Sequence, residues 1–205
     1  MGLAFYDPRS GALRELRPAA PPAVGVDAAD LSPRGRILAA SLADALDFLG
    51  LRAVHGREIR VGGADPGPRA AWLSAAALGG EVPDDAALAA RGFSPGDFRF
   101  FCARTHYRKP LDFSWEDLAS ARAELARLGD SARALAGVSL EASPRGRAGY
   151  LHRFREALSK DLDLPGAVTC VWDGLRPGAL SPGSRAALIR ETFPALGLAV
   201  LLGPL

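Results

Sequence analysis

The sequence has few of the features that mark membrane-spanning, secreted or strongly basic proteins. No apolar run reaches the ~20 residues that a membrane-spanning helix needs, and the N-terminus lacks the basic start and long apolar stretch of a secretory signal. The expected location is therefore the cytoplasm. A net charge of +2 over 205 residues gives no overall basic field, so any surface for nucleic acid must be local.

Cysteine, histidine and glycine-rich motifs are too sparse to predict a catalytic or metal centre. Cys102 and Cys170 lie far apart in helical patterns, which predicts buried thiols rather than a disulfide or a metal pair. His55 and His152 have no Asp, Glu or Cys at ligand or triad spacing. A phosphate-binding glycine loop and a Gly-x-Ser-x-Gly motif are also absent. We therefore predict no catalytic residue and no metal ligand.

The first third of the chain has the pattern of a small α/β unit. Residues 3–17 predict a hairpin, because alternating apolar residues flank the turn sequence Asp-Pro-Arg-Ser-Gly. An apolar run at 23–27 predicts a buried strand, and helical spacing follows from about residue 35 to residue 50. Residues 51–63 predict one or two more strands. Strand, helix and strand in this order are typical of a parallel α/β sheet.

From residue 70 onward the pattern predicts almost only helices, separated by prolines. Ser114 and Asp117 form a helix N-cap signal, and an apolar stripe follows at Trp115, Leu118, Ala121, Leu125 and Leu128. Further helices are predicted around Leu151, Phe154 and Leu158, and near residues 165–175 and 182–196. The predicted class is therefore α+β, mostly α, with a front part at residues 1–80 and a helical part at residues 81–205.

The stretch from residue 106, His-Tyr-Arg-Lys-Pro-Leu, resembles a segment of the cysteinyl-tRNA synthetases. In that family a His-Tyr-Arg-x-Pro-Leu motif follows the catalytic domain and leads into a helical bundle. Residues 86–101 and 150–175 resemble the neighbouring parts, with Lys160 to Pro165 at the family's Asp-Asp-Phe-Asn-Thr-Pro stretch. Residues 3–17 and 24–36 fall at its N-terminal hairpin and first nucleotide-binding block. The resemblance implies a remnant of a Rossmann-like nucleotide-binding front followed by a helical bundle, and it stops before the family's anticodon-binding end.

The departures from the family fall at its catalytic positions. Val24 stands where the family has a zinc-binding cysteine, and valine cannot ligate zinc. Pro33-Arg34-Gly35-Arg36 replaces the His-Ile-Gly-His that holds ATP phosphates, and residues 73–77 carry neither lysine of the Lys-Met-Ser-Lys-Ser loop. About ten residues between Gly63 and Leu73 replace the second half of the nucleotide fold and the other zinc ligands. We therefore expect no intact aminoacylation site and no cofactor, zinc included, and ATP binding remains an alternative.

Two sets of residues are candidate binding sites. Arg34, Gly35 and Arg36 precede or begin a predicted helix, whose N-terminus attracts phosphate; the alternative is a solvated pair of arginines in a loop. The resemblance implies an RNA-contacting junction at Arg99, Arg104, His106, Tyr107, Arg108 and Lys109, where Arg108 and Lys109 would contact phosphates. The alternative is a structural corner in which His106 and Tyr107 pack and hydrogen-bond.

Three functions remain open from the sequence. The first is a synthetase-like module without aminoacylation activity that binds tRNA or a protein, with another synthetase-like chain among the candidate partners. The second is a ligase-type enzyme that uses a reduced nucleotide pocket for an altered aminoacyl reaction. The third is a structural subunit of a larger complex.

Overall fold

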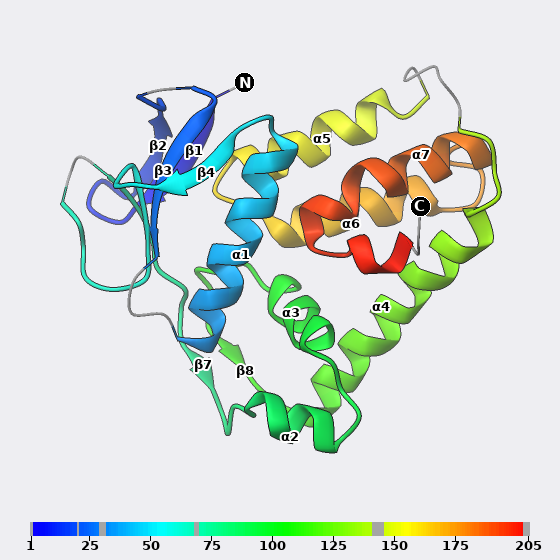
Figure 1. The fold of residues 1–205 in the computed structure, drawn as a ribbon, viewed down its shortest axis with the longest axis horizontal. Helices are drawn as coiled ribbons and strands as arrows, with labels where there is room; N and C mark the ends of the chain where they lie inside the picture. Colours follow the sequence, from blue (N-terminus) through cyan, green and yellow to red (C-terminus); the bar gives the residue numbers. More distant parts are fainter. Residues whose placement is uncertain (1, 20, 29–31, 68–69, 141–145, 203–205) are drawn as a thin grey trace.

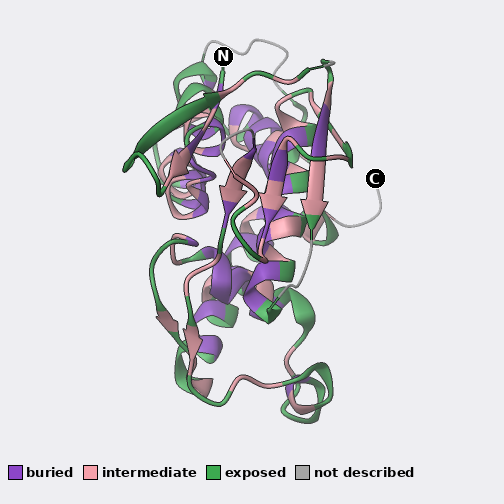
Figure 2. Cartoon of the chain, turned by 90° about the vertical axis from the view of Figure 1, so that its left-hand side faces the viewer, coloured by how far each residue is buried: buried purple, intermediate pink, exposed green. Residues whose placement is uncertain are grey.

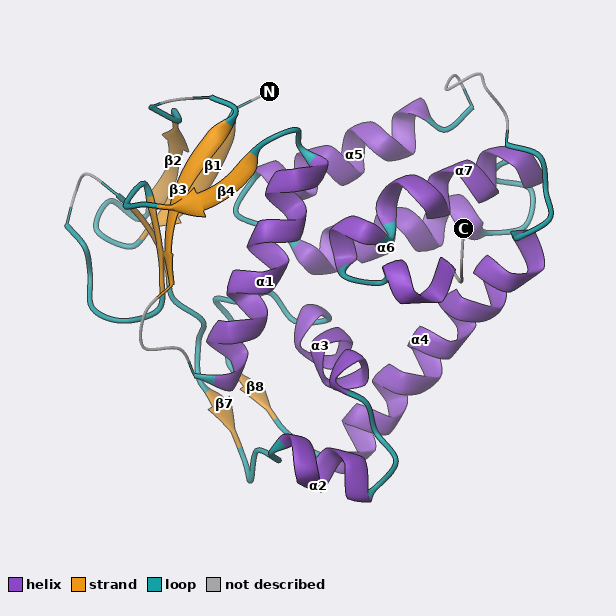
Figure 3. Cartoon of the chain, viewed as in Figure 1, coloured by secondary structure: helices purple, strands orange, loops and turns teal. Residues whose placement is uncertain are grey.

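A small sheet lies at one side of a larger group of helices (Figures 1 and 3). The computed structural model describes residues 2–19, 21–28, 32–67, 70–140 and 146–202. The predicted class, α+β and mostly α, is confirmed. Among the described residues, no helix is both long enough and apolar enough to cross a membrane.

The N-terminal hairpin is formed by β1 (Leu3–Asp7) and β2 (Ala12–Leu16), which pair antiparallel. The Asp7 carbonyl closes the turn by accepting hydrogen bonds from the amides of Ser10 (3.2 Å) and Gly11 (2.9 Å). Gly11 has a φ of +67°, a conformation that glycine adopts without steric cost. Leu3 and Phe5 alternate inward and are buried, so the hairpin predicted from this alternation is confirmed.

The larger sheet has the strand order β4-β3-β5-β6, and all four strands are parallel. Its strands are β3 (Ala23–Ala28), β4 (Arg52–His55), β5 (Ile59–Val61) and β6 (Ala71–Leu73). Helix α1 (Pro33–Phe48) connects β3 to β4 and lies between the sheet and the other helices (Figure 1). The predicted strand-helix-strand unit is therefore confirmed, although residues 29–31 of the block that resembles the synthetase motif lie outside the described residues.

The chain crosses over β3 between β4 and β5, which pair with opposite edges of that strand. Val26 is opposite both His55 and Ile59, so the three residues 56–58 carry the chain from one edge to the other. Gly25 and Gly56 meet at the crossing, where a Cβ on Gly56 would lie 2.5 Å from the Cα of Gly25. Only two residues without side chains permit this close backbone approach.

The remaining helices surround a shared core. They are α2 (Asp85–Ala90), α3 (Pro95–Ala103), α4 (Trp115–Leu135), α5 (Ala148–Ser159), α6 (Leu164–Leu175), α7 (Pro182–Thr192) and the 3₁₀ helices Pro194–Leu196 and Ala199–Leu202. The Ser114 side chain caps α4 by accepting from the Asp117 amide at 3.0 Å, as the sequence predicts. Leu118, Ala121 and Leu128 are fully buried, which confirms the predicted stripe.

The expectation that almost everything after residue 70 is helical is wrong for residues 70–84. This stretch contains β6 and β7 (Leu78–Gly79), and β7 pairs in parallel with β8 (Leu111–Asp112) in the link between α3 and α4. Extended backbone is favoured here because Gly80 has a φ of +82° and Pro83 follows.

One hydrophobic cluster joins the hairpin, the sheet and the helices. Phe5 of β1, Phe100 of α3, Phe154 of α5 and Phe193 after α7 are among its fully buried side chains. Buried residues gather in β1, β3 and β5 and in the helices behind the sheet, whereas β2 and the turns at the ends are largely exposed (Figure 2). The hairpin is therefore held against residues far from it in the sequence.

Candidate functional site

The link between α3 and α4, residues 104–114, contains the motif His-Tyr-Arg-Lys-Pro-Leu at residues 106–111, which resembles a segment of the cysteinyl-tRNA synthetases. Its first half is a tight turn, in which the Lys109 amide donates to the His106 carbonyl at 2.9 Å. The rings of His106 and Tyr107 are stacked, with their centroids 4.8 Å apart. Its second half, β8, is held by β7. Both halves of the link are thus ordered by hydrogen bonds.

The carboxylate of Asp161, in the turn between α5 and α6, contacts the side chains of this motif through both of its oxygens. Its Oδ1 accepts from the Tyr107 hydroxyl at 2.5 Å and from the Tyr6 amide at 2.8 Å. Its Oδ2 accepts from Arg108 Nε at 2.7 Å and lies 3.6 Å from His106 Nε2. Asp161 is only 4% exposed, so these contacts replace the water that a carboxylate needs. The structural corner weighed as an alternative is present in these contacts.

Asp161 holds its position with an uncommon backbone conformation. Asp161 and Leu162 have φ values of +61° and +48°, and each non-glycine residue in this region costs roughly 1–2 kcal/mol. The Asp161 amide donates to the Ala4 carbonyl of β1 at 2.6 Å. The side-chain and backbone contacts of Asp161 together offset this strain, as is usual where such conformations persist.

Burial and neighbouring charges set the proton affinities in this corner. Burial lowers the pKa of His106, against the opposing effect of the Asp161 carboxylate, so the imidazole is neutral near pH 7. Burial also raises the pKa of Tyr107, and its hydrogen bond to Asp161 adds to this effect. Both rings are therefore uncharged, and the positive charge of the motif comes from Arg108 and Lys109.

Arg34 holds the same link from inside the protein. It lies in the first turn of α1, is 2% exposed, and directs its guanidinium at backbone carbonyls. It donates to the carbonyls of Lys109 (2.6 Å), His106 (3.1 Å), Ala76 (3.1 Å), Thr105 (3.3 Å) and Ala77 (3.4 Å). Burial lowers its pKa. Its N–H groups therefore serve the backbone in this structure, and phosphate binding by Arg34 stays a prediction.

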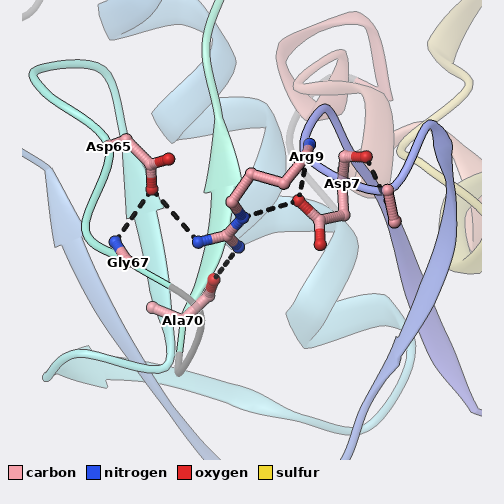
Figure 4. A network of polar contacts seen from close by, with 6 residues as sticks. Asp7, Arg9, Asp65, Gly67 and Ala70 are labelled. Atoms are coloured by element: carbon pink, nitrogen blue, oxygen red, sulfur yellow. Dashed lines mark hydrogen bonds and ion pairs between the residues drawn. The ribbon is translucent and has the colours of Figure 1, made fainter.

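The tip of the hairpin is held by hydrogen bonds and ion pairs around Arg9 (Figure 4). Arg9 Nε binds Asp7 Oδ1 at 2.8 Å, and its Nη atoms reach Asp65 Oδ1 (3.2 Å) and the Ala70 carbonyl (3.4 Å). Asp65 Oδ1 also accepts from the Gly67 amide at 2.8 Å. This network ties the tip of the hairpin to the chain that leads into β6.

Between the hairpin, the link and the turn before α6 lies a groove of about 780 Å³, which we call the basic groove. It is lined by Tyr6 and residues 11–13 of the hairpin, by Arg104, Thr105, His106, Arg108 and Lys109 of the link, and by Lys160, Asp161, Asp163 and Pro165. The chain has only two lysines, Lys109 and Lys160, and both line this groove. The lining thus contains four cationic side chains, Arg104, Arg108, Lys109 and Lys160, and two carboxylates, Asp161 and Asp163.

The cations of the basic groove differ in how far neighbouring carboxylates neutralise them. Arg104 Nε lies 3.2 Å from Glu124 on α4, and Lys160 pairs with Glu156 at 2.5 Å. Arg108 uses Nε for Asp161 and places its guanidinium 4.1 Å above the Tyr6 ring. Lys109 is exposed, and its ammonium has no ion-pair partner among the described residues. Lys109 and the outer edge of Arg108 are therefore best placed for an anionic ligand.

The structure separates the predicted residues into three places. The basic groove is lined by Arg104, His106, Arg108 and Lys109. Tyr107 does not line it but is buried and donates to Asp161, which does. Arg99 is elsewhere, because its guanidinium bonds to Asp44 and to Ser41 Oγ on α1. Arg36 is exposed and shares a second cleft of about 490 Å³ with Arg99, between α1, α2 and α3. Gly35 is buried in the first turn of α1, where its amide donates to Ser32 Oγ at 3.1 Å.

Sequence reasoning missed Asp161, Tyr6 and Lys160 as parts of the site. The signal for two of them was present, because residues 160–165 already resemble a family stretch rich in acidic residues. Tyr6 had no such signal, since its role depends on the hairpin docking beside the turn before α6.

The described residues do not fit the zinc site of the synthetases. Among them, no group of three or more His, Cys, Asp or Glu side chains could hold a metal ion. Val24, at the position of the family's zinc cysteine, is fully buried in β3. Burial raises the pKa of Cys102 to about 12, so this thiol stays protonated near neutral pH.

Comparison with known proteins confirms the resemblance found in the sequence. No protein-family model matches the chain. It is 31% identical over 115 residues to the cysteine–tRNA ligase of Novosphingobium aromaticivorans, covering 54% of this chain and 23% of that protein. For the cysteine–tRNA ligase of Treponema pallidum the values are 33% over 133 residues, 56% and 26%, and for cysteine–tRNA ligase 1 of Burkholderia lata 34% over 111 residues, 54% and 22%. The matched part is about a quarter of the length of these relatives.

Proposed function

We propose that this distant relative of the cysteine–tRNA ligases is an RNA-binding module without aminoacylation activity, with tRNA as its natural ligand. The observation that carries the proposal is the basic groove, which gathers both lysines of the chain with Arg104 and Arg108. The printed names of the relatives supply the reason to choose tRNA among polyanions. A location in the cytoplasm remains a prediction.

The charge distribution supports phosphate binding at this place rather than over the whole surface. The chain has a net charge of only +2, so a polyanion gains little from its overall field. Lys109 lacks an ion-pair partner among the described residues, and when it neutralises a phosphate, counterions condensed on the RNA are released. Contacts to phosphates position an RNA and carry no sequence information. We therefore expect salt-sensitive binding with little preference for sequence.

The absence of aminoacylation is proposed from the residues at the family's catalytic positions. Val24 cannot ligate zinc, and Arg34 directs its N–H groups at backbone carbonyls rather than at an open pocket. The parallel sheet, whose strand order turns back at β3, supports a Rossmann-like origin for the front part. The division into residues 1–80 and 81–205 also stays a prediction.

A second candidate is the ligase-type enzyme with a reduced nucleotide pocket. The cleft beside α1 favours it, because its volume of about 490 Å³ suits a small ligand and Arg36 lines it at the start of the helix. ATP would then raise the melting temperature in the absence of RNA, and Arg36→Ala would abolish this rise. A melting temperature that ATP leaves unchanged would exclude this function.

The proposed function is tested by titrating the protein with bulk tRNA at two salt concentrations. Lys109→Ala should weaken binding severalfold and reduce the salt slope by about 1, the effect of losing one phosphate contact. Arg133→Ala is the matched control, because Arg133 is an exposed α4 residue that does not line the basic groove. Binding that does not depend on salt, or equal effects of the two variants, would refute the proposal.

A second readout uses the small number of lysines. An amine-reactive reagent modifies only Lys109 and Lys160 among the side chains of this chain. Bound tRNA should therefore protect these two positions, as measured by peptide mass spectrometry. Full modification of both lysines in the presence of saturating tRNA would place any binding outside the groove.

A further inference from the structure

A small aromatic pocket opens beside the basic groove. It has a volume of about 240 Å³ and is lined by Tyr6, Pro8, Trp72, Ser74, Tyr107 and Arg108. Tyr6 and Arg108 line both cavities, so the aromatic pocket and the groove are neighbours that share one wall. Trp72 lies in β6 and Ser74 directly follows that strand, and neither residue lines the basic groove.

The rings around this pocket are held in place through their polar atoms. The Trp72 indole N–H donates to the Gly62 carbonyl at 3.2 Å, and the Tyr107 hydroxyl donates to Asp161. Tyr6 is fixed through its backbone amide, and the Arg108 guanidinium covers its ring. Because the polar groups of Trp72 and Tyr107 already have partners, the pocket offers a ligand mainly apolar and π surface.

The size and lining of the pocket favour one planar ring. Sites for drug-sized ligands occupy roughly 300–1,000 Å³, so a pocket of about 240 Å³ admits a ring system but not a complete nucleotide. The only charged group in its lining is Arg108, at the wall shared with the groove. A ligand that places a ring in the pocket would therefore carry its negative charge toward the groove.

A nucleotide of single-stranded RNA has this arrangement of ring and charge. We propose that the aromatic pocket receives one unstacked base, whose phosphate lies against Arg108 and whose neighbouring phosphates follow the groove toward Lys109. Bases in a duplex are stacked on one another, whereas unpaired bases stack on aromatic side chains of proteins. This inference rests on the proposed function and narrows it to RNA with an unpaired segment or end.

The test compares three RNAs of equal length: a single strand, the same strand with abasic riboses, and a blunt duplex. The intact strand should bind at least fivefold more tightly than the abasic strand, since base stacking contributes about 1–3 kcal/mol per base. It should also quench tryptophan fluorescence, because Trp72 lines the pocket. The duplex should bind without quenching.

Variants separate the pocket from the groove. Trp72→Ala should bind the intact and the abasic strand equally and lose the quenching, whereas Trp72→Phe should keep most of the preference for the intact strand. Trp172→Phe is the matched control, because Trp172 lies on α6 and bonds to Glu124 away from the pocket. If Trp72→Ala does not fold, Tyr6→Leu tests the same wall.

The outcomes distinguish this inference from the proposed function. Equal, salt-dependent binding of the intact and abasic strands to the unmodified protein would overturn the inference and leave the proposed function standing. Failure of all three RNAs to bind would overturn both, and the pocket would then be a candidate for an aromatic side chain of a protein partner. Preference for the intact strand that survives Trp72→Ala would also overturn the inference.

Discussion

Replacing Asp161 with asparagine tests whether one carboxylate holds the link, the hairpin and the turn before α6 together. The amide oxygen of asparagine can still accept from the Tyr6 amide and the Tyr107 hydroxyl. Its NH₂ group would instead face Arg108 Nε, which now donates to Oδ2 at 2.7 Å, so one donor would meet another. Asparagine also tolerates a positive φ, so the backbone conformation contributes little to the difference.

The expected loss of stability follows from the contact that disappears. A hydrogen bond to a charged group contributes roughly 1.5–3 kcal/mol. The Arg108 side chain is 41% exposed and can regain water, so we expect about 2 kcal/mol for Asp161→Asn. Asp161→Ala removes every side-chain contact of this buried carboxylate and should cost roughly 3–5 kcal/mol. For a chain of this size, 2 kcal/mol corresponds to a decrease of roughly 4–8 °C in melting temperature.

Urea unfolding followed by circular dichroism measures this loss. Asp130→Asn is the matched control, because it makes the same chemical change in an ion pair whose side chains are both 69% exposed, and it should cost less than about 0.5 kcal/mol. The double variant Asp161→Asn with Arg108→Met should lose less than the sum of the single losses. Equal midpoints for Asp161→Asn and Asp130→Asn, or fully additive losses in the double variant, would refute the assignment.

Three further predictions concern buried groups. Arg34→Met should cost about 3 kcal/mol or more in urea unfolding, because five carbonyls lose a charged donor, whereas Arg36→Met should cost under about 1 kcal/mol. Burial lowers the pKa of His106 below the unfolded value of 6.5, so near and below pH 6.5 the unfolded state binds more protons than the folded state. The free energy of unfolding should therefore fall as the pH decreases below about 6.5. His106→Gln should flatten this part of the profile when the urea midpoint is measured between pH 7 and pH 5. Iodoacetamide at about pH 8 should label Cys170 before Cys102, whose pKa of about 12 keeps it protonated, and equal rates by mass spectrometry would contradict its burial.

The elements that the sequence predicts correctly are those specified by neighbouring residues. The hairpin at 3–17, α1 and the capped start of α4 each follow from an alternation, a helical spacing or a cap within a few positions. The strands β6 and β7 were missed because they have three and two residues, too few for a periodic pattern. They are extended because they pair with strands elsewhere in the chain, which local propensity does not encode.

The candidate site was predictable on one side only. The concentration of basic and aromatic residues at 104–109 is visible in the sequence, but its main partner, Asp161, is 53 residues from Arg108 and 54 from Tyr107. Arg34 was interpreted as a candidate phosphate ligand because it lies near a predicted helix start, and a helix N-terminus attracts anions. Its burial depends on a set of carbonyls that converge only after β7 and the link have come together.

The attachment of β1 to the turn before α6 has a consequence for the order in which the protein matures on the ribosome. Tyr6 is made before Asp161, and its amide cannot form the hydrogen bond to that carboxylate until 155 more residues have been added. At about 5–20 residues per second, translation needs roughly 8–30 seconds to cover this distance. The nascent hairpin therefore spends that time without its docking partner, and its exposed Leu3 and Phe5 are the surface that a chaperone would shield.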